Sequence, residues 1–161
     1  MFHASPNRNN QAVINQDNFA TKFAMFEPSE RTLSKRRADV VLYGHIHHQY
    51  MDKLYNRTLI NVGSVGNSFN VIRNPEKDAN ILETTQAYYV ILEGKEGKKE
   101  YQDDFSIQFI HVPYDIQKEL EYEEKNIEKE DYRHEIKEGK YRNMTKIYDN
   151  FERLGIKRES I

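Results

Sequence analysis

The chain has 161 residues, of which 37% are hydrophobic and 31% charged, and its formal net charge is −2. That length allows one domain with a hydrophobic core, and the near balance of charge predicts no general binding of nucleic acid, so that any polyanion must be held locally. The chain contains no cysteine, which excludes disulfides, thiol nucleophiles and cysteine-based zinc sites. Because it also has no apolar run near the about 20 residues of a membrane span and no recognisable signal peptide, we expect a cytoplasmic protein without membrane contacts.

Helical spacing marks the first predicted elements. Phe19, Phe23 and Phe26 recur three or four residues apart, which favours a short helix with one apolar face. The stretch that begins at Ser29 also carries a helix start signal and runs to Asp39, where a strand is predicted. Together these segments predict a unit in which a helix precedes a strand.

Short apolar runs between turn-forming segments predict the strands. They cover residues 39–44, 58–63, 86–93 and 105–112, and a fifth run at 49–54 also fits a strand. The first run is almost wholly apolar, as in a strand buried on both faces, whereas apolar and polar residues alternate in the last, as in a half-exposed antiparallel strand. The charged, glycine-containing residues 93–100 fit a hairpin connection. We therefore predict a mixed sheet.

The sequence becomes strongly charged after Pro113. Two apolar stripes at helical spacing, one beginning at Ile116 and one at Met144, predict two or three surface helices over residues 115–155. The predicted fold class is accordingly layered α/β. A single domain is expected over residues 1–161, with a mixed α/β sheet region at 1–113 and charged C-terminal helices at 114–161.

Three of the six histidines of the chain stand within four positions of one another, directly after the first strand. His45 and His47 follow Gly44 at the strand end, where layered α/β folds commonly carry functional side chains. If the chain stays extended there, both imidazoles point to the same side, and neutral imidazole is a good ligand for zinc, manganese, iron or nickel. The pattern indicates a metal site, with ordinary loop histidines as the alternative.

Several sequence segments, taken together, resemble motifs of a known enzyme family. The sequence "YGHIHHQY" followed by "LINVGSVG" resembles the C-terminal signature of the calcineurin-like metallophosphoesterases, in which Gly-His-x-His ends a strand and Asn-x-Gly-Ser-x-Gly follows a short hairpin. The opening "MFHASPN" is similar to the His-Gly-Ser-Pro motif of the small bacterial and archaeal phosphodiesterases of that superfamily, with Ala4 in place of glycine. "TQAYYVILE" and "VPYDIQKELE" also look like the end of that subgroup, so the resemblance covers essentially the whole chain.

The resemblance implies a sandwich of two mixed sheets flanked by helices, of which this chain forms the C-terminal half. It also implies hydrolysis of a phosphomonoester or phosphodiester at two divalent transition-metal ions, which are manganese, iron, zinc or nickel. By resemblance, His3 and His45 ligate one ion and His47 the other. The loop that contains Gly63, Ser64 and Gly66 either approaches this site or is a turn that only reverses the chain.

The sequence departs from the family in its acidic ligands. The family's Asp-x-His, Gly-Asp and Gly-Asn motifs are expected upstream of His3, and the chain starts at Met1. No catalytic residue is therefore assigned, and we expect this chain alone to be inactive and to bind at most one metal ion weakly. The expected partners are a phosphate ester and either an N-terminal half polypeptide or a second copy of the chain. The alternatives are a non-catalytic binding or assembly module and a histidine-based metal-binding protein.

Overall fold

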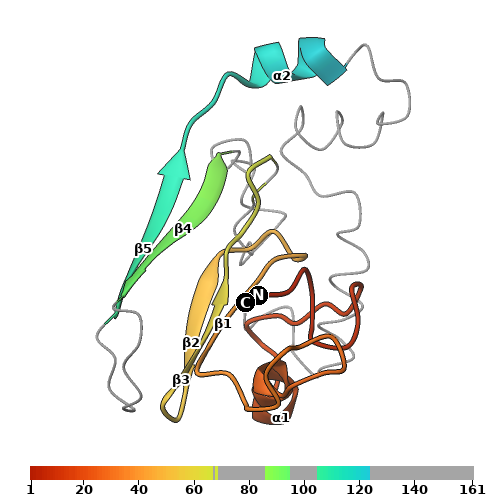
Figure 1. The fold of residues 1–161 in the computed structure, drawn as a ribbon. Helices are drawn as coiled ribbons and strands as arrows, with labels where there is room; N and C mark the ends of the chain where they lie inside the picture. Colours follow the sequence, from red (N-terminus) through yellow and green to blue (C-terminus); the bar gives the residue numbers. More distant parts are fainter. Residues whose placement is uncertain (67, 69–85, 95–104, 124–161) are drawn as a thin grey trace, which may run out of the picture.

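The computed structural model of the chain describes residues 1–66, 68, 86–94 and 105–123 (Figure 1). Its elements are α1 (Phe19–Phe23), the 3₁₀ helix η1 (Ala24–Phe26), β1 (Val40–Tyr43), β2 (Tyr50–Leu54), β3 (Arg57–Asn61), β4 (Ala87–Gly94), β5 (Phe105–Val112) and α2 (Ile116–Glu123). The mixed α and β content confirms the coarse fold class. Each of the five predicted strands is present, with ends that differ by at most two residues from those predicted. The two-sheet sandwich that the resemblance implies stays a prediction.

The first sheet has three strands in the order β1-β3-β2. β1 and β3 are parallel, and β2 is antiparallel to β3 because a short turn joins them. The N-terminal segment lengthens this sheet: Phe2 forms an isolated parallel bridge with Tyr43, and its backbone N–H donates to Leu42 O at 3.1 Å. The N-terminal segment, β1 and β3 are therefore parallel neighbours in the sheet, and all three end at the same edge.

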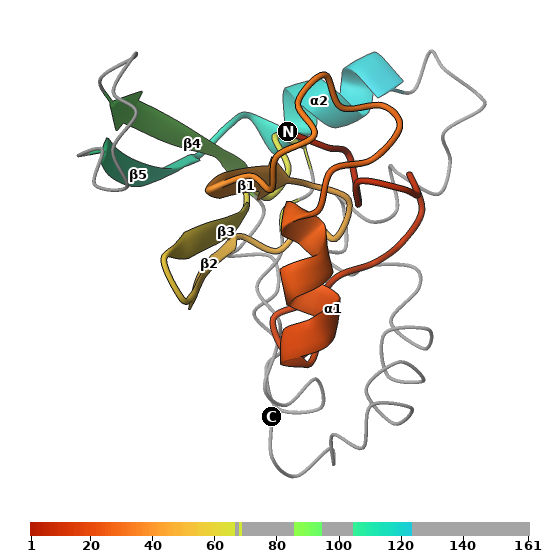
Figure 2. The ribbon, with the colours of Figure 1, turned by 60° about the horizontal axis from the view of Figure 1, so that its bottom comes forward.

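One face of β1 is fully buried. Val41 and Tyr43 are each 1% exposed and pack with Leu59 of β3 and with Met25 and Phe26 of η1 in the main hydrophobic cluster. The alternate residues of β1 are only half-buried, so the predicted burial on both faces is correct for one face only. α1 and the N-terminal loops lie on one side of this sheet, and the hairpin of β4 and β5 lies on the other (Figures 1 and 2).

The helix predicted to begin at Ser29 is absent, and residues 27–38 form a loop instead. Ser29 and Thr32 bond locally: Ser29 N–H donates to Thr32 Oγ1 at 3.0 Å, and Thr32 Oγ1 donates to Ser29 O at 2.8 Å. Such side chain to backbone bonds compete with helix formation. Ala38 N–H donates to Phe26 O at 2.9 Å, which closes the loop at its base. The aromatic spacing is in contrast a correct helix signal, because α1 and η1 together contain all three phenylalanines.

The second sheet is an antiparallel hairpin of β4 and β5, with a register from Ala87 opposite Val112 to Gly94 opposite Phe105. This pairing confirms the predicted antiparallel region, and the residues that connect its strands lie outside the described ranges. After the hairpin, Asp115 caps α2 by accepting a hydrogen bond from Lys118 N–H at 3.0 Å. The helices predicted after Glu123 also lie outside the described residues. Within the described ranges, no helix has the length and hydrophobicity of a membrane span.

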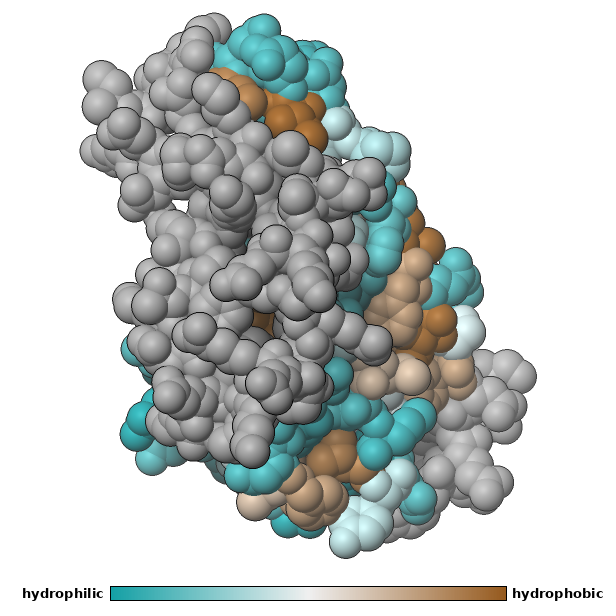
Figure 3. All heavy atoms as spheres, turned by 180° about the vertical axis from the view of Figure 1, so that it is seen from behind, coloured by the Kyte–Doolittle hydropathy of each residue, from teal (hydrophilic) through white to brown (hydrophobic). Residues whose placement is uncertain are grey.

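The hairpin exposes apolar side chains on both faces. Tyr89, Ile91 and Val112 alternate onto one face and are 37–41% exposed, and Leu92 and Phe109 on the other face are 41% and 38% exposed. Figure 3 shows hydrophobic side chains in a band along the side of the molecule that carries the hairpin. Apolar surface of this kind promotes association between proteins.

We predict that the 161-residue chain self-associates through this hairpin. Leu92→Thr combined with Phe109→Thr should reduce the association, because both changes remove apolar area from one face while threonine still favours a strand. Sedimentation velocity over a range of concentrations measures the effect. Leu33→Thr is the control, since Leu33 is fully exposed in the loop before β1. A wild-type chain that stays monomeric at every concentration contradicts the prediction.

Candidate functional site

Two histidines meet at the edge where the parallel segments end. His3 follows the residue that bridges to β1, and His45 follows Gly44 at the end of β1 itself. Gly44 N–H donates to His3 O at 2.9 Å, which aligns the two backbones. Parallel strands send their next residues to the same side of the sheet edge, and these side chains, 42 positions apart in sequence, consequently become neighbours.

The two imidazoles are in direct contact. His45 Nδ1 and His3 Nε2 lie 3.1 Å apart, and the rings meet edge to face at 72° with centroids 5.0 Å apart. At this distance one ring N–H donates to the other nitrogen when no cation is present. The same separation suits two ligands of one transition-metal ion, because two nitrogens at about 2.0–2.1 Å from zinc lie roughly 3 Å from each other. The pair therefore fits the group that the sequence predicts for it.

The loop after β1 is not extended, and this corrects the expectation that His45 and His47 project to the same side in extended chain. His45 has φ 71° and His47 has φ 55°. Ile46 N–H donates to Gly44 O at 2.9 Å, so His45 is the central residue of a three-residue turn. Such a turn with positive φ is rare and strained.

The third histidine contributes to the site through its charge. His47 is close enough that its positive form lowers the pKa of His45. Within the described part of the chain, however, no group of three or more histidine, aspartate or glutamate side chains is arranged to hold a metal ion. The structure thus brings His3 and His45 into contact, and the ligation of a second ion by His47 stays a prediction.

Burial is the main cause that lowers the pKa of His45, followed by the charges of His3 and His47. A hydrogen bond with the backbone of Asn10 acts in the opposite direction. A lowered pKa keeps this imidazole neutral near pH 7, and only the neutral ring can bind a metal ion.

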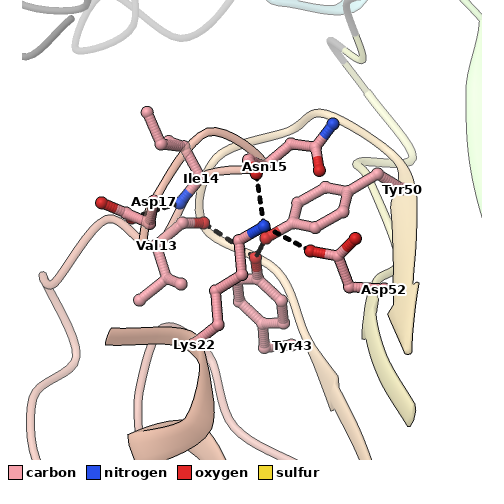
Figure 4. Close-up of polar contacts among 8 residues, drawn as sticks. All are labelled: Val13, Ile14, Asn15, Asp17, Lys22, Tyr43, Tyr50 and Asp52. Atoms are coloured by element: carbon pink, nitrogen blue, oxygen red, sulfur yellow. Dashed lines mark hydrogen bonds and ion pairs between the residues drawn. The ribbon is translucent and has the colours of Figure 1, made fainter. Parts of the chain in front are cut away.

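Two buried tyrosines hold the base of the histidine loop (Figure 4). Tyr43 is the last residue of β1 and Tyr50 is the first of β2, so they stand at the two ends of residues 44–49. Their hydroxyl groups are hydrogen-bonded to each other, and the Tyr43 hydroxyl also donates to Val13 O at 2.8 Å. These bonds tie both ends of the loop to the N-terminal segment.

A second contact beside the tyrosines fixes the same N-terminal segment. The Lys22 ammonium group bonds to the carboxylate of Asp52 on β2 and to Asn15 O, as Figure 4 shows. In the adjacent turn, Ile14 N–H donates to Asp17 Oδ2 at 2.8 Å. Residues 13–17 are in this way held against β2, next to the tyrosine pair.

Asn61 is the first residue of the Asn-x-Gly-Ser-x-Gly segment, but the sequence reasoning gave it no role. Its side chain is fully buried at the end of β3, where Asn61 Nδ2 donates to Gly44 O at 2.7 Å and Asn61 Oδ1 accepts from Gly63 N–H at 3.0 Å. One amide therefore joins the loop that carries the histidines to the loop after β3. The signal in the sequence was an asparagine at the end of an apolar strand, because a buried amide there needs polar partners.

Gln49 and His111 make a second connection to the histidine loop, and the sequence reasoning gave His111 only a surface or satisfied-core role. The Gln49 side-chain amide donates to Val62 O at 3.2 Å and to Tyr89 O at 3.1 Å, and its oxygen lies 2.8 Å from His111 Nε2. His111 in turn stacks on Tyr88, with ring centroids 3.8 Å apart. These contacts connect the end of the histidine loop to the hairpin, and only the folded structure reveals them.

The glycine and serine residues of the loop after β3 connect the two sheets. Ser64 N–H donates to Ser68 Oγ at 2.8 Å, Gly66 N–H donates to Ser64 Oγ at 3.3 Å, and Ser64 O accepts from Tyr88 N–H at 2.8 Å. The Tyr114 hydroxyl donates to Gly66 O. These bonds give the loop a connecting role, and its approach to a substrate stays a prediction.

Gly63 is required for steric reasons. It has φ 78°, and a Cβ atom added there would lie 2.9 Å from Tyr88 Cβ. Gly44 differs, since an added Cβ would lie 3.6 Å from His3 O, which is an ordinary contact distance. Glycine is therefore needed at the first position for the close approach of the hairpin.

Comparison of the chain with protein-family models, with curated proteins and with solved structures finds no match.

We predict that His45 titrates below the ordinary pKa of about 6.5 and that His47→Asn raises its pKa, because one positive neighbour is removed. Asparagine tolerates the positive φ of this position. Two-dimensional NMR of the imidazole resonances across a pH series measures the titration, with His45→Asn to assign the signal. Since the folded state binds fewer protons than the unfolded state, stability should fall as pH decreases below about 6.5, and less so in His45→Asn. A normal pKa for His45 contradicts the prediction.

We predict that Gly63→Ala destabilises the fold by about 1–2 kcal/mol or more, because alanine is strained at positive φ and its Cβ would overlap Tyr88. Urea unfolding followed by circular dichroism gives the free energy of unfolding. Gly44→Ala is the matched control and should cost clearly less. Equal losses in the two variants would show that the close approach of the hairpin is not a constraint.

Proposed function

We propose that this chain provides the histidine ligands of a two-metal phosphoesterase site of the calcineurin-like kind, with a phosphomonoester or phosphodiester as substrate. The observation that supports this most directly is the pair of imidazole nitrogens, His3 Nε2 and His45 Nδ1, at 3.1 Å. Both side chains come from motifs that resemble those of the family, and both stand at the edge where parallel strands end.

In this proposal the histidines bind the metal ions, and the residues around them hold the histidine loop in place. His3 and His45 would hold one ion and His47 the other, and the ions when bound would polarise the phosphate and activate a water molecule. The lowered pKa of His45 keeps it ready to bind without first losing a proton. Asn61 and the tyrosine pair hold the loop in place, so that little conformational freedom is lost on binding.

The carboxylates of such a site must come from elsewhere. In the part of the chain that the structure describes, no acidic side chain joins the histidines in a metal-binding group, and a two-metal centre needs a bridging carboxylate to hold the ions and the nucleophilic water. We propose that a second polypeptide segment with the Asp-x-His, Gly-Asp and Gly-Asn motifs supplies them. It would be an N-terminal half, because a second copy of this chain contains neither an Asp-x-His nor a Gly-Asp segment.

The second candidate is a metal-binding module without hydrolytic activity. It is favoured by the same observation, because two histidines in contact, with no carboxylate beside them among the described residues, are a set of ligands for one weakly held ion. The two candidates differ in what happens when the carboxylates are supplied.

The test is hydrolysis of bis-(p-nitrophenyl) phosphate with added manganese. The chain alone should be no faster than the variant with His45→Asn and His47→Asn, because the described residues include no bridging carboxylate that would hold the nucleophilic water. Asparagine retains the backbone conformation at both positions. Adding a polypeptide with the three acidic motifs should restore hydrolysis, and the double variant should abolish it again.

The outcomes separate the candidates. Hydrolysis by the chain alone that depends on His45 and His47 contradicts the claim that carboxylates are missing. A folded and bound complement that gives no hydrolysis, together with weak calorimetric binding of one zinc or manganese ion that His45→Asn removes, favours the metal-binding module. Absence of any metal binding, with or without the complement, contradicts both.

A further inference from the structure

A partly exposed aromatic cluster lies at the opposite end of the sheet from the histidines. Phe19 and Phe23 of α1 stack with ring centroids 5.1 Å apart, and Tyr55 meets both rings edge to face at 5.4 and 6.0 Å. Phe19 is 50% exposed and Tyr55 is 80% exposed. Both α1 and the turn between β2 and β3 lie at the lower end of the molecule in Figure 1.

The backbone at Tyr55 makes its exposure notable. This residue has φ 53°, a conformation that glycine or asparagine adopts in such turns and that is unfavourable for a bulky side chain. The turn does not need a tyrosine, and the core does not bury it. Although the ring packs edge to face on Phe19 and Phe23, Tyr55 is 80% exposed, so much of the ring is accessible to a ligand.

A basic loop continues from this cluster. Arg31, Lys35, Arg36 and Arg37 are all exposed in residues 29–37, where Glu30 is the one acidic residue. The Arg37 guanidinium lies 4.8 Å from the centroid of the Phe23 ring and also pairs with Glu27. Arg36 forms no ion pair with any described residue. Its guanidinium group can therefore bind an anionic partner.

The loop leads toward the histidine pair. Arg31 Nη1 donates to Asn9 Oδ1 at 3.3 Å, and the backbone of the next residue, Asn10, bonds to His45. The contacts of residues 29–37 thus extend from the Phe23 ring at one end to Asn9, the residue before Asn10, at the other.

We propose that the aromatic-basic surface, formed by Phe19, Phe23, Tyr55, Arg31, Lys35, Arg36 and Arg37, binds single-stranded nucleic acid. Guanidinium and ammonium groups bind phosphates, and exposed rings stack with bases, which only a single strand presents to them. A duplex would use the charges and leave the rings without a partner. The net charge of −2 is compatible with this because binding is local to the surface.

The test is fluorescence anisotropy of a labelled oligothymidylate of about 15 nucleotides, a length that covers a typical single-strand site. The full chain is used at low salt with EDTA, so that the result does not depend on metal binding or on the proposed hydrolysis. We expect binding that weakens as salt increases, and weaker binding of a duplex of equal length.

Five variants, two of them controls on α2, locate the surface. Tyr55→Asn removes the ring and suits the turn, and it should weaken binding about fivefold or more, whereas Tyr122→Asn, at a residue of α2 that is 65% exposed, should have no effect. Arg36→Gln should reduce the slope of log affinity against log salt by about 0.7, and Lys118→Gln on α2 should not. Phe19→Ala provides a second test of stacking, because alanine retains the helix.

Each result decides the proposal. Circular dichroism first shows whether a variant is folded, and Phe19→Ala replaces Tyr55→Asn if the latter is not. Equal losses in Tyr55→Asn and Tyr122→Asn, equal affinity for the duplex, or no binding by the unmodified chain each overturn it. The proposal is supported if Tyr55→Asn and Phe19→Ala weaken binding of the oligothymidylate and Tyr122→Asn does not.

Discussion

The parallel alignment of three chain segments is the constraint on which the candidate site depends. Residues 2 and 3, β1 and β3 all run in one direction, so their last residues arrive at one edge of the sheet. Hydrogen bonding between Gly44 N–H and His3 O fixes the first pair of segments. The buried amide of Asn61 fixes the second pair, because its two ends bond to Gly44 O and Gly63 N–H. Without this alignment, two histidines far apart in sequence would have no reason to meet.

The same alignment explains how a strained loop persists. Positive φ at His45 and His47 costs free energy, and several contacts determine the loop at once. The tyrosine pair holds its base, Asn61 holds its first residue, and Gln49 bonds to the hairpin at its end. The hairpin is therefore more than an outer layer, since its approach at Gly63 and its contact with Gln49 contribute to the conformation of the histidine loop.

The parts of the fold that depend on local pattern were predictable, and those that depend on tertiary bonds were not. The strands follow from apolar runs between turn residues, and Gly44 correctly marks the strand end from which the histidines emerge. The helix at Ser29 was wrong because hydroxyl groups of the loop compete for the backbone. Likewise the extended histidine loop was wrong, because a turn that returns to Gly44 O depends on partners distant in sequence.

The tyrosine pair also sets an alkaline limit for the protein. Burial is the main cause that raises the pKa of both Tyr43 and Tyr50, so their hydroxyl groups stay protonated in the folded state where free tyrosine, with a pKa of about 10, would ionise. The unfolded chain therefore gains two ionisations that the folded chain lacks, and rising pH favours unfolding. Because these hydroxyl groups close the base of the histidine loop, alkali should disturb the candidate site and the core of the sheet in a single event.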